Sequence, residues 1–188
     1  MLQQLFLSAN EKTSMCRLVV VWGLGIAAAL SPFISGYAAC LPDDLVGVLS
    51  QQHPGWKVVG LGDLRVDDQA ILRRFRLDEC PGVAKGRFNG RDDAYAVTLF
   101  DRRGGLKQVL LVLTPSTASG VTHVDLISPP ERVDVLSVVS RAPPGNFSGV
   151  DGSQVRIRND SIKFETLEAG SLVYYFDGRS YRSMQISE

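Results

Sequence analysis

The chain has 188 residues, with 20 basic and 20 acidic side chains, so its formal net charge is zero. This balance lacks the basic excess with which nucleic-acid-binding proteins neutralise phosphates, and it gives no basis for adsorption to an anionic membrane surface. The length corresponds to one domain with one core after a leader segment is removed.

The first forty residues have the three parts of a secretory signal peptide. Lys12 and Arg17 precede an apolar run at 18–30, and small residues follow from Ser35 onward. A run of that length is too short to cross a hydrocarbon core of about 30 Å as a helix. The pattern therefore predicts a signal peptide over residues 1–38 and export to an oxidising compartment, a bacterial periplasm.

Several alternatives stay open in this region. Cleavage after Ala39 fits nearly as well as cleavage after Ala38, and Met15 could be the true start. The apolar run could serve as a membrane anchor, and Cys40 could carry a lipid. We expect instead that cleavage leaves a single mature domain over residues 39–188, without a stable membrane span.

The mature chain has a near-neutral charge and two cysteines. Removing residues 1–38 leaves 18 basic and 19 acidic residues, together with Cys40 and Cys80. Two cysteines in an exported protein predict one disulfide. In the chain-entropy model, closing a loop of this size stabilises the fold by about 4 kcal/mol. A redox-active pair is disfavoured because no C-x-x-C spacing is present.

Two short helices are expected in the N-terminal part of the mature chain. Asp43 and Asp44 precede an apolar stretch at 45–49, where acidic residues suit the start of a helix. Residues 53–55, His-Pro-Gly, end this helix, and a short strand follows at 56–59. The segment 67–76 has acids first, bases last and apolar residues at helical spacing, which predicts the second helix.

From Val83 onward the apolar residues alternate with a period of two, which predicts strands at 83–88, 95–100, 106–113 and 121–127. Residues 101–105 form the loop between the second and third of these strands. Proline pairs then flank an apolar stretch at 133–139. Near the C-terminus, Asn159 and Asp160 predict a hairpin between 155–158 and 162–165. A further hairpin joins 172–176 to 181–186. We predict an α+β domain in which two short N-terminal helices pack on an antiparallel sheet of two β-meanders.

Residues that could carry catalysis are sparse. His53 and His123 are isolated, whereas a zinc site needs three or four ligands. No serine lies in a G-x-S-x-G turn, and the paired carboxylates are sequence neighbours that point to different sides. We therefore predict no catalytic residue, no metal site and no cofactor, and a protein that is not an enzyme.

Residues 80–100, CPGVAKGRFNGRDDAYAVTLF, and the closing segment 164–181 resemble small secreted bacterial proteins that carry one degenerate FG-GAP-type segment. In calcium-binding members the loop has acids at alternate positions, which supply oxygen ligands. Here Arg87 and Arg91 stand at ligand positions and only Asn89 remains. The resemblance therefore implies a strand–turn–strand element without calcium. Proteins of this kind are also similar to periplasmic immunity proteins, which neutralise type VI secretion effectors such as phospholipases.

The function we expect is that of a periplasmic binding or inhibitor protein, with an immunity protein as the sharpest version and a secreted effector enzyme as the partner. An inhibitor needs a rigid complementary surface rather than a reactive residue. A calcium-stabilised envelope module, and a hydrolase that uses His123 with a distant carboxylate, are the alternatives. The residues predicted to contact the partner are Asp63, Arg65, Asp67, Asp68, Arg73, Arg74, Arg87, Asn89, Arg91, Asp92 and Asp93.

Overall fold

The structure, a computed structural model, describes residues 40–75, 79–116 and 120–187. The predicted signal peptide, with its cleavage site, lies outside the described residues. Within these ranges, no helix combines the length and the apolar character needed to cross a bilayer.

Both predicted helices form, with ends close to those expected. Helix α1 (Asp43–Gln52) carries two acidic residues in its first turn, and the N–H of His53 donates to the carbonyl of Leu49 at 2.8 Å where it ends. Leu45 and Leu49, one turn apart, are its buried face. A short 3-10 turn, η1 (Leu61–Asp63), leads into α2 (Val66–Phe75), which has acids in its first turn and arginines in its last. This charge order suits the helix dipole.

The first sheet is antiparallel and has five strands. Four of them have the order β1-β3-β4-β5, and β2 also pairs with β3, so that β1 and β2 lie end to end along the same strand. The bounds are β1 (Lys57–Val58), β2 (Val83–Gly86), β3 (Ala94–Asp101), β4 (Lys107–Pro115) and β5 (Thr122–Arg132).

The second sheet is also antiparallel, with the order β11-β10-β9-β6, and β7 and β8 form a separate two-stranded ribbon. The bounds are β6 (Val138–Ala142), β7 (Gly145–Ser148), β8 (Gln154–Ile157), β9 (Ser161–Thr166), β10 (Gly170–Phe176) and β11 (Tyr181–Ser187).

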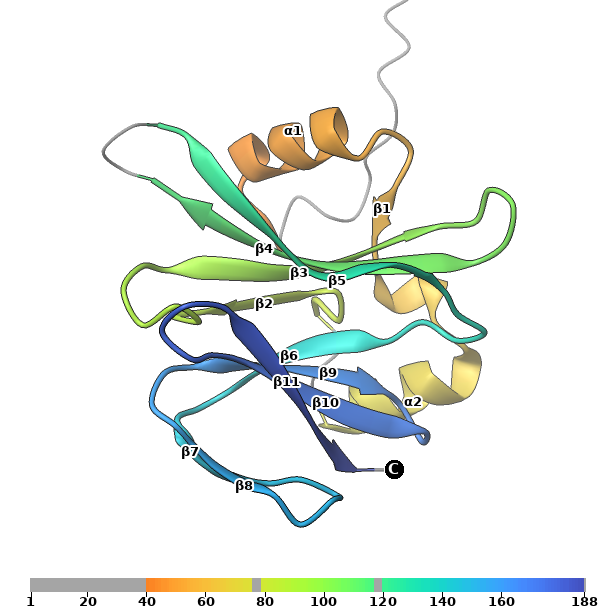
Figure 1. Cartoon of the computed structure of the whole chain (residues 1–188). Coiled ribbons are helices and arrows are strands. Elements are labelled where there is room, and N and C mark those ends of the chain that lie inside the picture. Colours follow the sequence, from red (N-terminus) through yellow and green to blue (C-terminus); the bar gives the residue numbers. More distant parts are fainter. Residues whose placement is uncertain (1–39, 76–78, 117–119, 188) are drawn as a thin grey trace, which may run out of the picture. The chain divides into compact units, whose positions relative to one another are not determined.

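The first sheet lies between α1 and the second sheet (Figure 1). Because successive side chains of a strand point to opposite faces, β3 and β4 supply apolar residues to both layers. Val97 and Leu99 pack with α1, whereas Ala96 and Leu110 pack with Ile162 of the second sheet. Strands buried on both faces read as continuous apolar runs, as β3 and β4 do. Helix α2 contributes Leu72 to a third apolar group that also contains Phe100, Val138 and Leu167.

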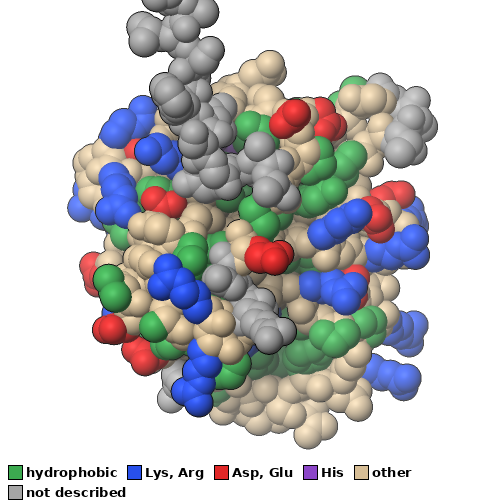
Figure 2. Space-filling model, turned by 180° about the vertical axis from the view of Figure 1, so that it is seen from behind, with side chains coloured by type: hydrophobic (Ala, Val, Ile, Leu, Met, Phe, Trp, Pro, Cys, Tyr) green, Lys and Arg blue, Asp and Glu red, His purple; other side chains and the backbone are tan. Residues whose placement is uncertain are grey.

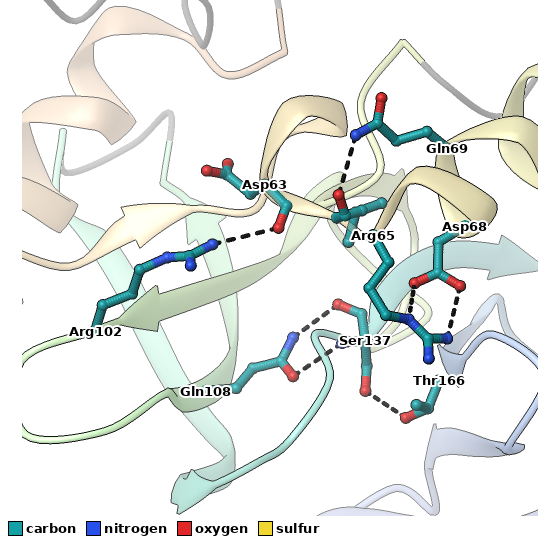
Figure 3. Close-up of polar contacts among 9 residues, drawn as sticks. Asp63, Arg65, Asp68, Gln69, Arg102, Gln108, Ser137 and Thr166 are labelled. Atoms are coloured by element: carbon teal, nitrogen blue, oxygen red, sulfur yellow. Dashed lines mark hydrogen bonds and ion pairs between the residues drawn. The ribbon is translucent and has the colours of Figure 1, made fainter.

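A buried glutamine joins the two sheets. Gln108 of β4, 3 % exposed, donates from Nε2 to the carbonyl of Ser137 at 2.7 Å and accepts the N–H of Ser137 at 3.0 Å (Figure 3). The hydroxyls of Ser137 and Thr166 lie 2.6 Å apart. Ser137 directly precedes β6, and the Gln108 amide bonds its N–H and its carbonyl as a neighbouring strand would. These buried backbone groups would otherwise lack a hydrogen-bond partner, at a cost in stability.

The predicted fold class, α+β, is wrong: strands dominate the described residues, and the two helices have ten residues each. The two predicted meanders belong to different sheets, β2–β5 and β9–β11, rather than to one. The periodicity did not indicate strands β6 and β7, which lie among proline pairs. Strand β6 pairs with β9, beyond the intervening β7–β8 ribbon, whereas β7 pairs with the next strand, β8. The layers that cover the core are therefore mainly sheets.

The predicted hairpin at Asn159-Asp160 is also wrong. The chain turns there, but β8 pairs with β7, while β9 pairs with β6 and β10. A turn signal marks the change of direction without fixing the partner. The other hairpins, between β3 and β4 and between β10 and β11, are confirmed.

The predicted disulfide between Cys40 and Cys80 is confirmed, with Cα atoms 5.8 Å apart. It lies just before Gly82, where the ends of β1 and β2 meet. Glycine is required at position 82 because the backbone of Val59 lies so close that a Cβ there would overlap the Val59 carbonyl. The N–H of Thr98 in β3 donates to the Gly82 carbonyl at 2.9 Å, which holds the glycine in place.

We expect Gly82→Ala to lower the free energy of unfolding by roughly 1–3 kcal/mol, because the new methyl group meets backbone rather than a flexible side chain. Gly47→Ala is the matched control: this helical position has no atom within 4 Å of a built Cβ, so stability should rise by roughly 0.5–1 kcal/mol. Urea unfolding followed by circular dichroism measures both. If Gly82→Ala were as stable as the unsubstituted protein, the close contact between Gly82 and the backbone of Val59 would be contradicted.

Candidate binding groove

The two sheets meet along β2 and β6, a contact that we name the seam. At one end, beside the disulfide, the N–H of Val139 donates to the Pro81 carbonyl at 2.8 Å. At the other end the Asp160 carboxylate accepts the N–H of Arg87 at 2.9 Å, and its Oδ2 lies 3.7 Å from Nη1 of Arg141. A backbone bond and a carboxylate thus fasten the two ends of the seam.

A groove with a volume of about 500 Å³ lies over the seam, and we name it the seam groove. Residues of α2, of the segment 79–81, of β2, of β6 and of β9 line it. Its buried apolar lining consists of Leu72, Pro81, Ala84, Val138, Val139 and Leu167. The groove is therefore apolar at its base and open to solvent above.

Charged side chains surround this base. The cations are Lys85, Arg141 and Lys163, and the carboxylates are Glu79 and Glu165. Nζ of Lys163 lies 2.9 Å from Glu165, which leaves Lys85 and Arg141 as cations whose ion pairs, at 3.4 and 3.7 Å, are longer. Figure 2 shows a face on which hydrophobic patches lie among Lys and Arg side chains, with Asp and Glu side chains between them.

An aromatic side chain stands at the mouth of the groove. Phe75, the last residue of α2, is 64 % exposed although it lines the groove. The guanidinium carbon of Arg74 lies 5.9 Å from the centre of its ring. Large exposed aromatics beside a groove are typical of binding surfaces, where they become the most strongly buried contacts.

The first group of predicted contact residues divides into two kinds. Arg65 and Asp68 form a two-pronged ion pair, with nitrogen–oxygen distances of 2.8 and 2.9 Å, and Asp68 is 1 % exposed (Figure 3). Asp63 accepts the N–H of Gly60 with its carboxylate. These groups hold the start of α2. Asp67, Arg73 and Arg74 are exposed.

The second predicted group forms a loop that is closed by its own contacts. Oδ1 of Asn89 accepts the N–H groups of Arg91 and Asp92, at 2.9 and 3.1 Å. Hydrogen bonding to Arg87, and then the nearby Lys85, lower the pKa of Asp93 below its ordinary value. The side-chain oxygen of Asn89 thus accepts backbone amides of its own loop. No cluster of three or more metal-binding side chains occurs within the described ranges.

The two predicted groups lie at opposite ends of β2, so the structure does not bring them into contact (Figure 1). The seam groove lies between them: its lining begins with Ile71 in α2 and reaches Lys85, two residues before Arg87. The groove residues on β6 and β9 were missed by sequence reasoning. No local pattern in residues 138–141 indicates that they lie beside β2.

The two histidines lie apart from this groove. The ring of His53 packs edge-on against Trp56, with centroids 6.3 Å apart. Nε2 of His123 lies 3.0 Å from Oδ1 of Asp125, on the same strand, and the histidine side chain is 73 % exposed. The carboxylate in contact with His123 is therefore a close sequence neighbour, and the pair lies in an open surface hollow that Asp92 and Asp93 also line.

Comparison with protein-family models, with curated proteins and with solved structures found no match for this chain. The resemblance to FG-GAP-type segments and to immunity proteins accordingly stays a prediction.

We expect Asp160→Ala to destabilise the protein by roughly 1.5–3 kcal/mol, because a charge-assisted hydrogen bond to the N–H of Arg87 is lost from a carboxylate that is only 14 % exposed. Asp92→Ala, at an exposed position in the loop 87–93 that contains the Arg87 donor, should change stability by less than about 0.5 kcal/mol. Thermal unfolding of both variants checks this. Similar losses in the two variants would show that Asp160 does not fasten the seam.

Proposed function

We propose that the protein is a periplasmic binding protein that blocks a secreted effector enzyme, in the manner of an immunity protein. The observation that supports this most is the seam groove, which combines an apolar base, an exposed phenylalanine and a charged rim in which Lys85 and Arg141 have only long ion pairs. Such a surface suits a partner segment that inserts an apolar side chain and presents carboxylates on either side. Buried apolar anchors supply most of the affinity of an interface, and charge complementarity supplies orientation and association rate.

The size of the groove fits one anchoring segment rather than a whole interface. A stable protein complex buries about 800 Å² on each partner. Helix α2 lines the groove, and the loop 87–93 follows β2, whose Lys85 also lines it, so the exposed residues of both extend the surface available to a partner. The predicted contact residues Asp67, Arg73, Arg74 and Arg91 thus become the outer part of a binding surface whose centre is the groove.

The chemistry of the lining favours binding over catalysis. Ser140 and Lys163 stand opposite each other in the β6–β9 pair, an arrangement that a serine–lysine hydrolase would require. However, Nζ of Lys163 lies 2.9 Å from Glu165, so its charge is directed to a carboxylate rather than to the hydroxyl. Cys80, which also lines the groove, is held in the disulfide and offers no thiol.

The disulfide also supports the proposed compartment. Disulfides persist in oxidising surroundings such as the bacterial periplasm and are rare in the cytosol. Together with the predicted signal peptide over residues 1–38, this favours a site of action outside the cytoplasm. A stapled, rigid surface binds with little loss of conformational entropy, which suits an inhibitor.

The test uses protein purified from an exporting bacterium that expresses the full chain with a C-terminal tag. The unsubstituted protein, a groove variant (Lys85→Glu with Arg141→Glu) and Phe75→Ser serve as baits for a lysate of the source organism. Val150→Ser, which also changes an exposed apolar residue but lies outside the groove, is the control. We expect a secreted enzyme to be retained by the unsubstituted protein and by the control, with at least about tenfold weaker binding to both groove baits.

The inhibitory role has its own readout. The activity of the retained enzyme should fall as the unsubstituted protein is titrated in, and the groove variants should require at least about tenfold more protein for the same effect. An enzyme retained equally by all four baits would refute the placement at the groove. An enzyme whose activity is unchanged at saturation would refute inhibition.

A further inference from the structure

Strand β5 ends the first sheet with an edge that no other strand covers within the described residues. The N–H of Ser116 donates to the Val121 carbonyl at 3.2 Å, and the register then pairs Thr114 with His123 and Val112 with Asp125. In an antiparallel ladder, hydrogen-bonded pairs alternate with pairs whose backbone groups point outward. The backbone groups of Thr122, Val124 and Leu126 therefore face away from β4.

Only the far end of this edge is protected against pairing. The register shifts between the pairs Leu111–Leu126 and Leu110–Ser128, so Ile127 is an extra residue in β5, and two prolines follow at 129 and 130. Bulges and prolines are the usual means by which sheets prevent edge-to-edge association. Residues 122–126 contain neither, and Leu126 is 58 % exposed. The edge is thus blocked beyond residue 126 and open before it.

The open segment, Thr-His-Val-Asp-Leu, is complementary to itself. If two copies pair antiparallel about Val124, Thr122 faces Leu126 of the second copy and His123 faces its Asp125. The twofold symmetry produces this His–Asp contact twice. In this register the residues whose backbone groups point outward, Thr122, Val124 and Leu126, lie opposite the same three residues of the second copy. Their N–H and carbonyl groups can therefore form the hydrogen bonds of a regular ladder. When His123 is protonated, this contact joins opposite charges, which stabilise a strand pair when they lie directly across it, whereas like charges destabilise it.

The apolar residues of the segment support the same arrangement. Val124 packs on the apolar group between α1 and the first sheet, and Leu126, on the same face, lies exposed beyond it. Pairing would cover Leu126 with Thr122 of the second copy and remove part of this apolar surface from water.

We propose that residues 122–126 of β5 are a self-association edge, through which a second copy of this chain extends the first sheet across a twofold axis at Val124. The site is separate from the seam groove, so that each protomer of the dimer would keep one groove for its partner.

A charge exchange tests this on protein purified from an exporting bacterium that expresses the full chain. Sedimentation equilibrium from about 1 μM to about 1 mM should show a monomer–dimer equilibrium. His123→Asp places carboxylates opposite each other, and dimerisation should weaken by about tenfold, since the contact occurs twice. Asp125→His should weaken it similarly at a pH near 6. The combined variant restores opposite signs and should dimerise as the unsubstituted protein does.

Asp134→His, the same change at an exposed residue beyond the prolines, is the control and should leave the equilibrium unchanged. A chain that stays monomeric throughout this concentration range overturns the proposal. So does a dimer that neither single exchange weakens, or one that the combined variant fails to restore, because each result removes the His123–Asp125 contact from the interface.

Discussion

The seam between β2 and β6 is the contact on which the rest of the structure depends. One backbone hydrogen bond, from Val139 to Pro81, joins the edge of one sheet to the edge of the other. The disulfide at Cys80 and the carboxylate of Asp160 fasten the two ends of the seam. An isolated bond of this kind contributes only about 1 kcal/mol. Its effect is larger here because it fixes which strands border the groove, and the disulfide reduces the number of unfolded conformations with which the closed arrangement competes.

Burial on both faces of the first sheet makes this arrangement rigid. Leu110 and Leu111, adjacent in β4, are both fully buried, one against the second sheet and the other beneath α1. A register shift of one residue would exchange their environments, so the packing of each layer specifies the other. Gln108 adds a polar constraint, because its amide pairs with both backbone groups of Ser137. The groove is therefore carried by strands that have little freedom to move, which suits a surface used for recognition.

Local patterns in the sequence were sufficient for features formed by neighbouring residues. The charge order of α2, the apolar runs of β3 and β4 and the pair of cysteines each depend on short-range chemistry, and the structure contains them. The class of the fold was mispredicted because β6 and β7 lack a strong alternation, and because β6 pairs with β9 across the intervening β7–β8 ribbon. The seam groove could not be predicted for the same reason. Its lining comes from segments near residues 72, 84, 139 and 163, and no spacing in the chain relates them. Burial of Asp68 could not be predicted either. It lies in a dense run of charged residues, which is typical of a solvent-exposed helix face, but its ion pair with Arg65 allows it to be buried.

The central claim is that the seam groove is where this protein meets its partner. Hydrogen–deuterium exchange of the full-length protein, compared with and without the enzyme captured by it, tests that claim most directly. The account predicts slower exchange in the groove segments 71–75, 83–85 and 138–141 on binding, with 145–157 unchanged as an internal reference. Slower exchange confined to segments outside the groove, with 83–85 and 138–141 unaffected, would contradict it.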